Sequence, residues 1–245
     1  MGVPVTIEIC VSDVESAIAA EVGGADRVEL CDNLAVGGTT PSAGTIAEAC
    51  RWLSIPVQVL IRPRGGDFVY SDRELAVMRH DLEAAKALGA AGVVLGVLTG
   101  ERTIDRDRTA ALIAMARPLS VTFHKAIDHT RDLLESLDAL IAIGVNRVLT
   151  SGGRPSAMDG VDTLKSLVDR AGNRLAVMAG GRLSADDIGT VIHRGSVGEI
   201  HLGSTVTRTV AGPAPAPDGS ETGWTRTDAR QVAAIVAQVQ ALSGS

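Results

Sequence analysis

The chain has 245 residues, of which 45% are hydrophobic and 2% aromatic, and its formal net charge is −6. This acidic balance, without a basic stripe, argues against a nucleic-acid partner and against an anionic membrane surface. No apolar run reaches the ~18 residues of a membrane span, and three cysteines without a CxxC pair favour a reducing compartment over a disulfide framework. The start, MGVPVTIEIC, lacks the features of a secretory signal, so we expect a cytoplasmic protein.

Short β-branched runs alternate with longer amphipathic runs along the whole chain, a pattern typical of parallel α/β folds. The predicted strands cover residues 5–10, 27–31, 57–62, 92–97, 120–124, 147–151, 175–179 and 199–202. Helix-period segments lie near residues 13–22, 42–53, 73–88, 105–116, 132–143, 159–171, 184–194 and 228–242. Strand–helix alternation over the whole chain predicts a (β/α)8 TIM barrel, a single domain over residues 1–245.

Residues 205–227 break this rhythm before the last helix. The segment TVTRTVAGPAPAPDGSETGWTRT is rich in Pro, Ala, Gly, Ser and Thr, a composition typical of loops. We expect an irregular loop here, either a passive linker or a flap over the barrel mouth that uses Arg208 or Trp224.

Side chains alternate along a strand, so the apolar positions identify which residues face the barrel axis. On the first strand Ile7 and Ile9 face the helices, which leaves Glu8 and Cys10 facing inward. The same reasoning places further polar and charged side chains inside the barrel, namely Arg27, Glu29, Cys31, Gln58, Arg62, Thr122, His124, Glu199 and His201. Isolated buried charges are costly. We therefore expect these groups to form a structural ion-pair network or to meet a ligand at the carboxyl ends of the strands, where active sites of this fold lie.

Two sequence segments suggest an anion site. Arg62 and Arg64 flank Pro63 and precede a Gly pair, and guanidinium groups bind carboxylate and phosphate through paired hydrogen bonds. Gly180 and Gly181 after strand seven, with Gly203 and Ser204 after strand eight, match the position of the phosphate site of this fold. Glycine also serves tight turns, so the alternative is a purely structural role.

Cys10 and Cys31 are predicted at the ends of adjacent strands. Neighbouring strands lie about 4.8 Å apart, so both thiols are able to reach one ion, and two thiolates suit Cu(I). The alternative is a pair of buried cysteines that pack as small apolar residues. Met178 and His201 are candidates for a third soft ligand.

Several segments in chain order resemble the CutC family over residues 7–204. They include EICVSDVESAIAAEVGGADRVELCDNLAVGGTTPS (8–42), IRPRGGDFVYSDRE (61–74), VTFHKAID (121–128) and VMAGG (177–181). The resemblance implies a TIM barrel, a homodimer and a role in copper homeostasis, with a Cu(I) site at Cys10 and Cys31. The sequence departs from the family pattern at Lys125, where relatives usually carry Arg.

Two functions remain open at this stage. The resemblance favours a copper-handling protein whose partner is a copper ion and which needs no other cofactor. The charged barrel interior favours an enzyme (a lyase, isomerase or hydrolase) that acts on a small anionic metabolite. His124 is then a general acid or base, and Asp128 orients it or the substrate. The catalytic residues expected for the enzyme are Glu8, Glu29, Arg62, His124 and Asp128.

Overall fold

Eight parallel strands close into a barrel in the computed structural model, which describes residues 5–212 and 223–243. β1 pairs with β2 on one side and with β8 on the other, and every other barrel strand pairs with its sequence neighbours. The strands are β1 (Thr6–Val11), β2 (Arg27–Leu30), β3 (Val57–Leu60), β4 (Gly92–Leu95), β5 (Ser120–Phe123), β6 (Arg147–Thr150), β7 (Ala176–Gly180) and β8 (Glu199–Leu202). This confirms the predicted (β/α)8 TIM barrel.

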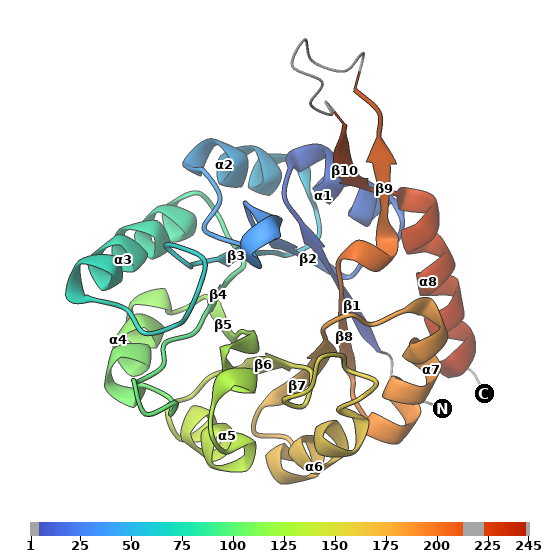
Figure 1. Ribbon diagram of the computed structural model, residues 1–245. Helices are drawn as coiled ribbons and strands as arrows, with labels where there is room; N and C mark the ends of the chain where they lie inside the picture. The colour runs from blue at the N-terminus through green and yellow to red at the C-terminus, as the bar shows by residue number, and fades with distance from the viewer. Residues whose placement is uncertain (1–4, 213–222, 244–245) are drawn as a thin grey trace.

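The helices surround the ring of strands (Figure 1). They are α1 (Val14–Val22), α2 (Ala43–Trp52), α3 (Asp72–Ala87), α4 (Arg106–Ala116), α5 (Leu133–Ala142), α6 (Val161–Ala171), α7 (Ala185–Gly195) and α8 (Ala229–Ser243). Three short 3-10 helices, η1 (Leu34–Val36), η2 (Lys125–His129) and η3 (Ser204–Val206), follow β2, β5 and β8 at the carboxyl ends of the strands. Within the described ranges, no helix is both long and apolar enough to cross a membrane.

The alternation of side chains follows the sequence prediction. Ile7, Ile9 and Val28 belong to the main apolar core, which lies between strands and helices. A separate small apolar cluster, formed by Cys31, Leu60 and Val94 with Cys10 packed against it, lies inside the barrel. The polar and charged side chains predicted to point inward are buried or nearly so, which makes the barrel interior unusually polar for a folded core.

A glycine in β4 leaves room for a polar contact across the barrel interior. Gly92 is paired with Gln58 on β3 and with Ser120 on β5. The Ser120 hydroxyl donates to Oε1 of Gln58 at 3.1 Å. A Cβ atom at position 92 would lie 1.9 Å from that oxygen, so only glycine fits here without rearrangement.

The segment predicted as an irregular loop at 205–227 is partly regular, so that prediction was wrong for its two ends. β9 (Thr207–Val210) and β10 (Trp224–Thr227) form an antiparallel pair in which Trp224 faces Val210. Thr, Val and Trp are residues that favour strands, and they occupy these ends, whereas the Pro-rich centre lies outside the described residues. Figure 1 shows the pair extending away from the barrel beside α1, and the Thr227 N–H anchors it by donating to the Ser16 hydroxyl at 3.2 Å.

Candidate functional site

The amino-terminal half of the barrel interior holds a chain of ion pairs. Glu8 on β1 accepts a hydrogen bond from Nε of Arg27 on β2 at 2.5 Å. Arg27 also pairs with Glu199 on β8, and Glu199 in turn pairs with Arg147 on β6. The second oxygen of Glu8 lies 2.7 Å from Nδ1 of His201. These groups compensate one another, so the predicted ion-pair network exists and uses Glu8 as a structural carboxylate.

The charges around Glu8 fix its ionisation. Burial alone would raise its pKa, but the hydrogen bond from His201 and the charges of His201 and Arg27 hold the pKa of Glu8 at about 2. His201 shows the complementary effect. Burial would lower the pKa of His201. The charge of Glu29 and the hydrogen bonds of His201 with Cys10 and Glu8 instead raise this pKa well above the usual value. His201 therefore remains an imidazolium above the network.

His201 connects the ion-pair network to the two predicted thiols. Its Nε2 atom lies 3.8 Å from Oε2 of Glu29, and that oxygen lies 3.4 Å from Sγ of Cys31. Sγ of Cys31 lies 3.7 Å from Sγ of Cys10. One ligand atom each from Cys10, Glu29 and Cys31 falls within 4.8 Å of the others, which is compact enough to hold a metal ion. Met178, one of two candidates for a further soft ligand, instead accepts from Nη2 of Arg27 at 3.0 Å.

The two thiols differ in acidity because they share one proton. The hydrogen bond with Cys31 is the largest cause that lowers the pKa of Cys10 to about 5, and the nearby His201 adds to the effect. The same hydrogen bond, together with burial, raises the pKa of Cys31 well above its usual value. Burial also raises the pKa of Glu29 to about 8. Near neutral pH the pair therefore consists of a Cys10 thiolate and a Cys31 thiol.

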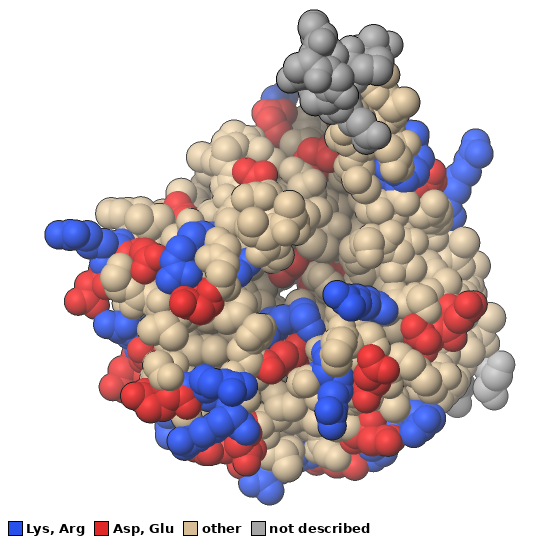
Figure 2. All heavy atoms as spheres, in the orientation of Figure 1, with Lys and Arg blue, Asp and Glu red and all other residues tan. Residues whose placement is uncertain are grey.

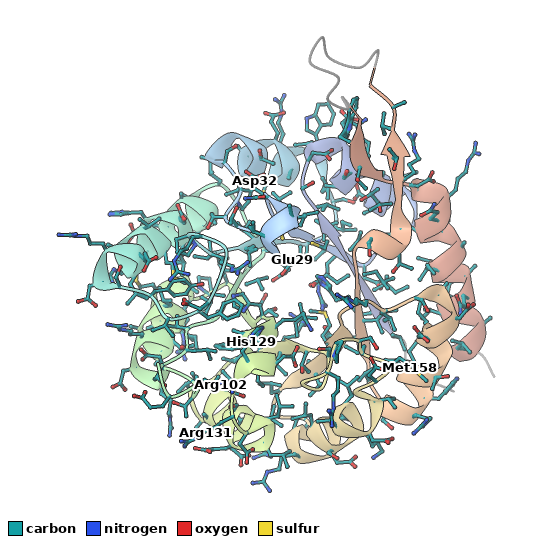
Figure 3. The ribbon with its side chains drawn as sticks, in the orientation of Figure 1. Glu29, Asp32, Arg102, His129, Arg131 and Met158 are labelled. Carbon is teal, nitrogen blue, oxygen red and sulfur yellow. The ribbon has the colours of Figure 1, made fainter. Side chains whose placement is uncertain are left out.

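An inner cavity of about 210 Å³ opens beside the thiols. Arg62 and His124, both predicted as site residues, face it from the ends of β3 and β5. Figure 3 places Glu29 toward the centre of the barrel, in contrast to Arg131 at the periphery. The cavity is lined by residues that include Cys10, Glu29, Cys31, Arg62, His124 and His201. The alternation of side chains along the strands therefore predicted most of the polar groups that line the inner cavity.

An outer cavity of about 400 Å³ continues toward the solvent between the loops after β7 and β8. Gly181, Gly203 and Ser204 line it, as expected for the predicted anion site, whereas Gly180 lies within β7 and does not. The two cavities have four lining residues in common: Cys10, Leu34, Lys125 and His201. Figure 2 shows the hollow at the centre of this face with charged side chains around it.

Lys125 stands at the junction of the two cavities, and sequence reasoning did not select it. Its Nζ atom donates to Oδ2 of Asp128 at 2.7 Å and to the Ser151 hydroxyl at 2.6 Å. The sequence feature that could have identified Lys125 as a site residue is its position directly after His124, at the end of a strand. Asp128 contacts Lys125, Thr150 and Ser151, but not His124 as the sequence had suggested. Asp128 therefore positions Lys125.

The structure does not bring Arg64 to this site. Its guanidinium donates to Glu74 at 2.5 Å and to Asp67 at 3.0 Å, and it lies over the ring of Tyr70. These contacts connect the β3–α3 loop to the first turn of α3, outside both cavities. The predicted clamp of two arginines is therefore reduced to Arg62.

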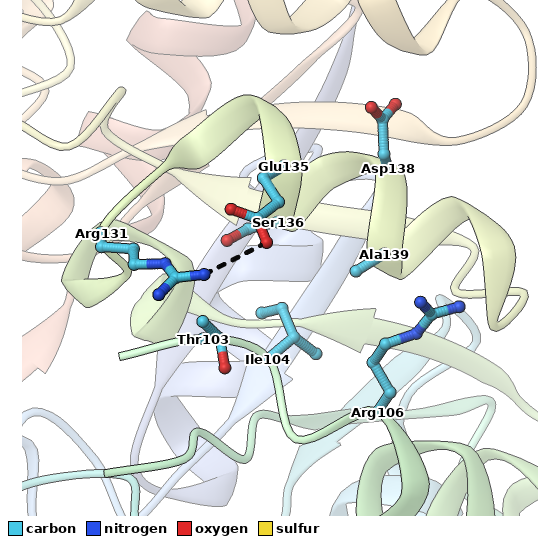
Figure 4. A pocket seen from close by; sticks show the side chains of 8 residues that line it. All are labelled: Thr103, Ile104, Arg106, Arg131, Glu135, Ser136, Asp138 and Ala139. Carbon is cyan, nitrogen blue, oxygen red and sulfur yellow. Dashed lines mark hydrogen bonds and ion pairs between the residues drawn. The ribbon is translucent and has the colours of Figure 1, made fainter. Parts of the chain in front are cut away.

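A further cleft lies away from the barrel mouth. It measures about 420 Å³ and is formed by the loop before α4 together with α5. Figure 4 shows its charged lining, in which Arg131 pairs with Glu135. Both of these side chains are more than half exposed, and the cleft contains none of the buried acid, base or thiol groups of the barrel. The barrel mouth remains the better candidate for chemistry.

Comparison with known proteins identifies relatives of this chain by sequence. A sequence model described as the CutC family matches residues 5–206. A CutC family protein of Vibrio campbellii is 47% identical over 204 residues, which cover 82% of this chain and 83% of the relative. A human protein named copper homeostasis protein cutC homolog is 46% identical over 202 residues, covering 82% of this chain and 74% of that protein.

Solved structures agree with the sequence comparison. The structure of a copper homeostasis protein CutC from Streptococcus agalactiae superposes with a TM-score of 0.78 at 37% identity, covering 82% of this chain and 98% of that one. Thiamine phosphate pyrophosphorylase from Pyrococcus furiosus superposes with a TM-score of 0.59 at 17% identity, covering 96% of each chain, which shows a common fold alone.

Proposed function

Because the chain belongs to the CutC family, we propose that it takes part in copper homeostasis by binding Cu(I) between the Cys10 and Cys31 sulfurs. The names of the human and streptococcal relatives support the copper role. The observation that carries the proposal for this chain is the 3.7 Å separation of the two sulfurs beside a solvent-connected cavity. Copper is here the cargo of the protein.

The donor set fits Cu(I) better than a harder ion. Thiolates are soft ligands that select Cu(I), whereas carboxylates suit harder cations. Cys10 provides a thiolate near neutral pH, and Cys31 provides a second one when the metal displaces its proton. Glu29, whose pKa is raised by burial, is poorly disposed to act as a third anionic ligand.

Anaerobic competition against a chromophoric Cu(I) chelator tests the proposal. We expect one Cu(I) per chain in the parent protein and its loss in Cys10→Ser and Cys31→Ser. Cys50→Ser is the matched control, because Cys50 is a free cysteine on α2, away from the barrel mouth, and should leave binding unchanged. Equal copper affinity in the parent and in the double variant of Cys10 and Cys31 would overturn the proposal.

A second candidate function is proton-transfer catalysis on a small anionic metabolite. The supporting observation is that Cys10, Glu29 and His124 line one cavity, and that the pKa of Cys10 is lowered to about 5 while that of Glu29 is raised to about 8. Groups whose environments move their pKa values in opposite directions are typical acid–base pairs. The test is incorporation of solvent deuterium into a panel of small carboxylates and phosphate esters, followed by NMR. Exchange that persists in Glu29→Gln and Cys10→Ser would contradict this role.

We also propose a cytoplasmic homodimer. Reduced cysteines suit the cytoplasm, and the CutC resemblance supports the dimer. Light scattering of the purified chain measures its mass directly, and a monomer at micromolar concentration would contradict the dimer.

A further inference from the structure

We propose that the inner cavity is a binding site for a small carboxylate, which pairs with the Arg62 guanidinium and accepts a hydrogen bond from Nε2 of His124. This inference is independent of copper binding. It deepens the second candidate function by naming its ligand class, and it requires no catalysis.

The first observation is an unused donor on His124. The imidazole is 6% exposed, and Nδ1 accepts a hydrogen bond from the Ala126 N–H at 3.2 Å. The proton of the neutral ring is therefore on Nε2, which is buried and has no partner among the described residues. Buried donors are nearly always satisfied in folded proteins, so an unused one on a residue that lines a cavity indicates a missing acceptor.

The position of this ring is fixed by its surroundings. A Cβ atom at Gly96 would lie 2.4 Å from Cε1 of His124, so the glycine allows the ring to lie where it does. The ring of Phe68 packs at 5.0 Å on one side, and Phe123 lies at 5.9 Å. His124 therefore presents Nε2 in one orientation, as a preorganised donor does.

The second observation is an uncompensated cation. Arg62 is 5% exposed, and its terminal nitrogens donate to the backbone carbonyls of Val36 (3.0 Å), Gly38 (2.7 Å) and Gly66 (2.9 Å). The Phe68 ring covers its face at 4.9 Å, and the buried Tyr70 hydroxyl lies close enough to interact with the guanidinium. Within the described part of the chain, no carboxylate lies within 4.0 Å of this guanidinium. Buried charges are normally paired, so the missing partner is an anion.

These observations specify the ligand. Carbonyl and hydroxyl contacts orient Arg62 without neutralising it, which leaves one net positive charge on Arg62 and a free N–H donor on His124. A monoanionic carboxylate supplies one charge and two acceptor oxygens. The volume of about 210 Å³ admits only a small molecule.

Melting-temperature titrations of the full chain with sodium lactate test the site. Lactamide, sodium chloride at matched ionic strength and inorganic phosphate serve as comparison probes. We expect saturable stabilisation by lactate, which lactamide and chloride do not produce. His124→Asn, which keeps an acceptor for Ala126 and loses the Nε2 donor, and Arg62→Gln should each weaken lactate binding at least about tenfold. Arg64→Gln, in the same loop but outside the cavity, should bind lactate as the parent does.

Three results would overturn the proposal: no saturable effect of lactate, equal lactate affinity in the parent and in His124→Asn, or tighter binding of phosphate than of lactate. Should Arg62→Gln fail to fold because the loop carbonyls lose their donor, His124→Asn decides alone. The other proposals fail separately. The double variant Cys10→Ser and Cys31→Ser removes copper binding and retains lactate binding, and deuterium exchange can be absent while lactate still binds.

Discussion

The sulfurs of Cys10 and Cys31 lie 3.7 Å apart, although 20 residues separate them in the sequence. Their proximity follows from the register of β1 and β2, in which Cys10 is paired with Glu29. Cys31 is the residue directly after the end of β2. The Cys31 N–H donates to the Val11 carbonyl at 2.8 Å and so continues the parallel ladder. The backbone thus places the two thiols together before any ligand arrives.

Cys10 should be the reactive cysteine of the chain. Its thiolate is the nucleophile, and with a pKa of about 5 it should be alkylated by iodoacetamide at pH 6, whereas Cys50, whose pKa is raised by burial, should not. Cys31→Ala removes the largest cause of the low pKa and should shift the rate profile of Cys10 to higher pH. Mass spectrometry of the labelled peptides measures the alkylation rates of Cys10 and Cys50 in the parent chain and of Cys10 in Cys31→Ala. Preferential labelling of Cys50, or a Cys10 rate that still rises above pH 8, would contradict the thiolate assignment.

Loss of the Glu8 charge should destabilise the fold. Glu8 is fully buried and holds both Arg27 and His201, so Glu8→Gln leaves buried positive charge without its partner. We expect a loss of about 3 kcal/mol in the free energy of unfolding, measured in urea. The matched control is Glu48→Gln, an exposed partner of Arg51, which should change stability by less than about 0.5 kcal/mol. Similar losses in the two variants would show that the buried network contributes little.

The pH dependence of stability should report His124. Burial, with the charge of Arg62, lowers the pKa of His124 from 6.5 to about 3. Above pH 6.5 the ring is neutral in both states. As the pH falls from 6.5 toward 3, the unfolded chain takes up a proton that the folded chain does not, so the free energy of unfolding decreases.

His124→Asn should therefore flatten the slope of unfolding free energy against pH between pH 6 and 4 by about 1.4 kcal/mol per pH unit, one proton. His80→Asn, at an exposed position of α3, is the matched control. Identical slopes in the parent and in His124→Asn would mean that the ring takes up its proton in the folded state.

Gly92→Ala should disturb the barrel interior. The new Cβ atom would lie 1.9 Å from Oε1 of Gln58 and 2.3 Å from Oγ of Ser120. We expect a loss of about 2 kcal/mol from overpacking, measured by chemical denaturation. Adding Gln58→Ala to the same chain should restore much of it. Gly198→Ala, where no atom lies within 4 Å of the new Cβ, should be nearly neutral, and an equal effect at both glycines would refute the steric explanation.

Local pattern was sufficient to predict the barrel and the direction of its side chains. The alternation of Ile7 and Ile9 with Glu8 and Cys10 needs no tertiary knowledge, and the structure places these residues as the pattern indicated. The prediction was less complete at strand ends. Arg64 and Arg62 are two residues apart, but the first turns toward Glu74 on α3 and the second toward loop carbonyls, a choice that only the folded loop determines.

Composition was also a weak guide to the excursion after β8. The Pro-rich composition suggested an irregular loop, whereas the flanking segments form an antiparallel strand pair, Thr207–Val210 with Trp224–Thr227. Likewise, the alternation of side chains along each strand predicted that Arg27, Glu199 and His201 lie inside the barrel. It did not predict which of them contact Glu8. Pairing among buried charges depends on register between strands, and strand register is not encoded in any single strand.

X-ray absorption spectroscopy of the Cu(I)-loaded protein tests the copper proposal most directly. The proposal predicts two sulfur neighbours around copper in the parent chain and in Cys50→Ser, and their loss in the double variant Cys10→Ser and Cys31→Ser. A copper ion surrounded by nitrogen and oxygen alone in the parent chain, or sulfur neighbours that persist in the double variant, would contradict it.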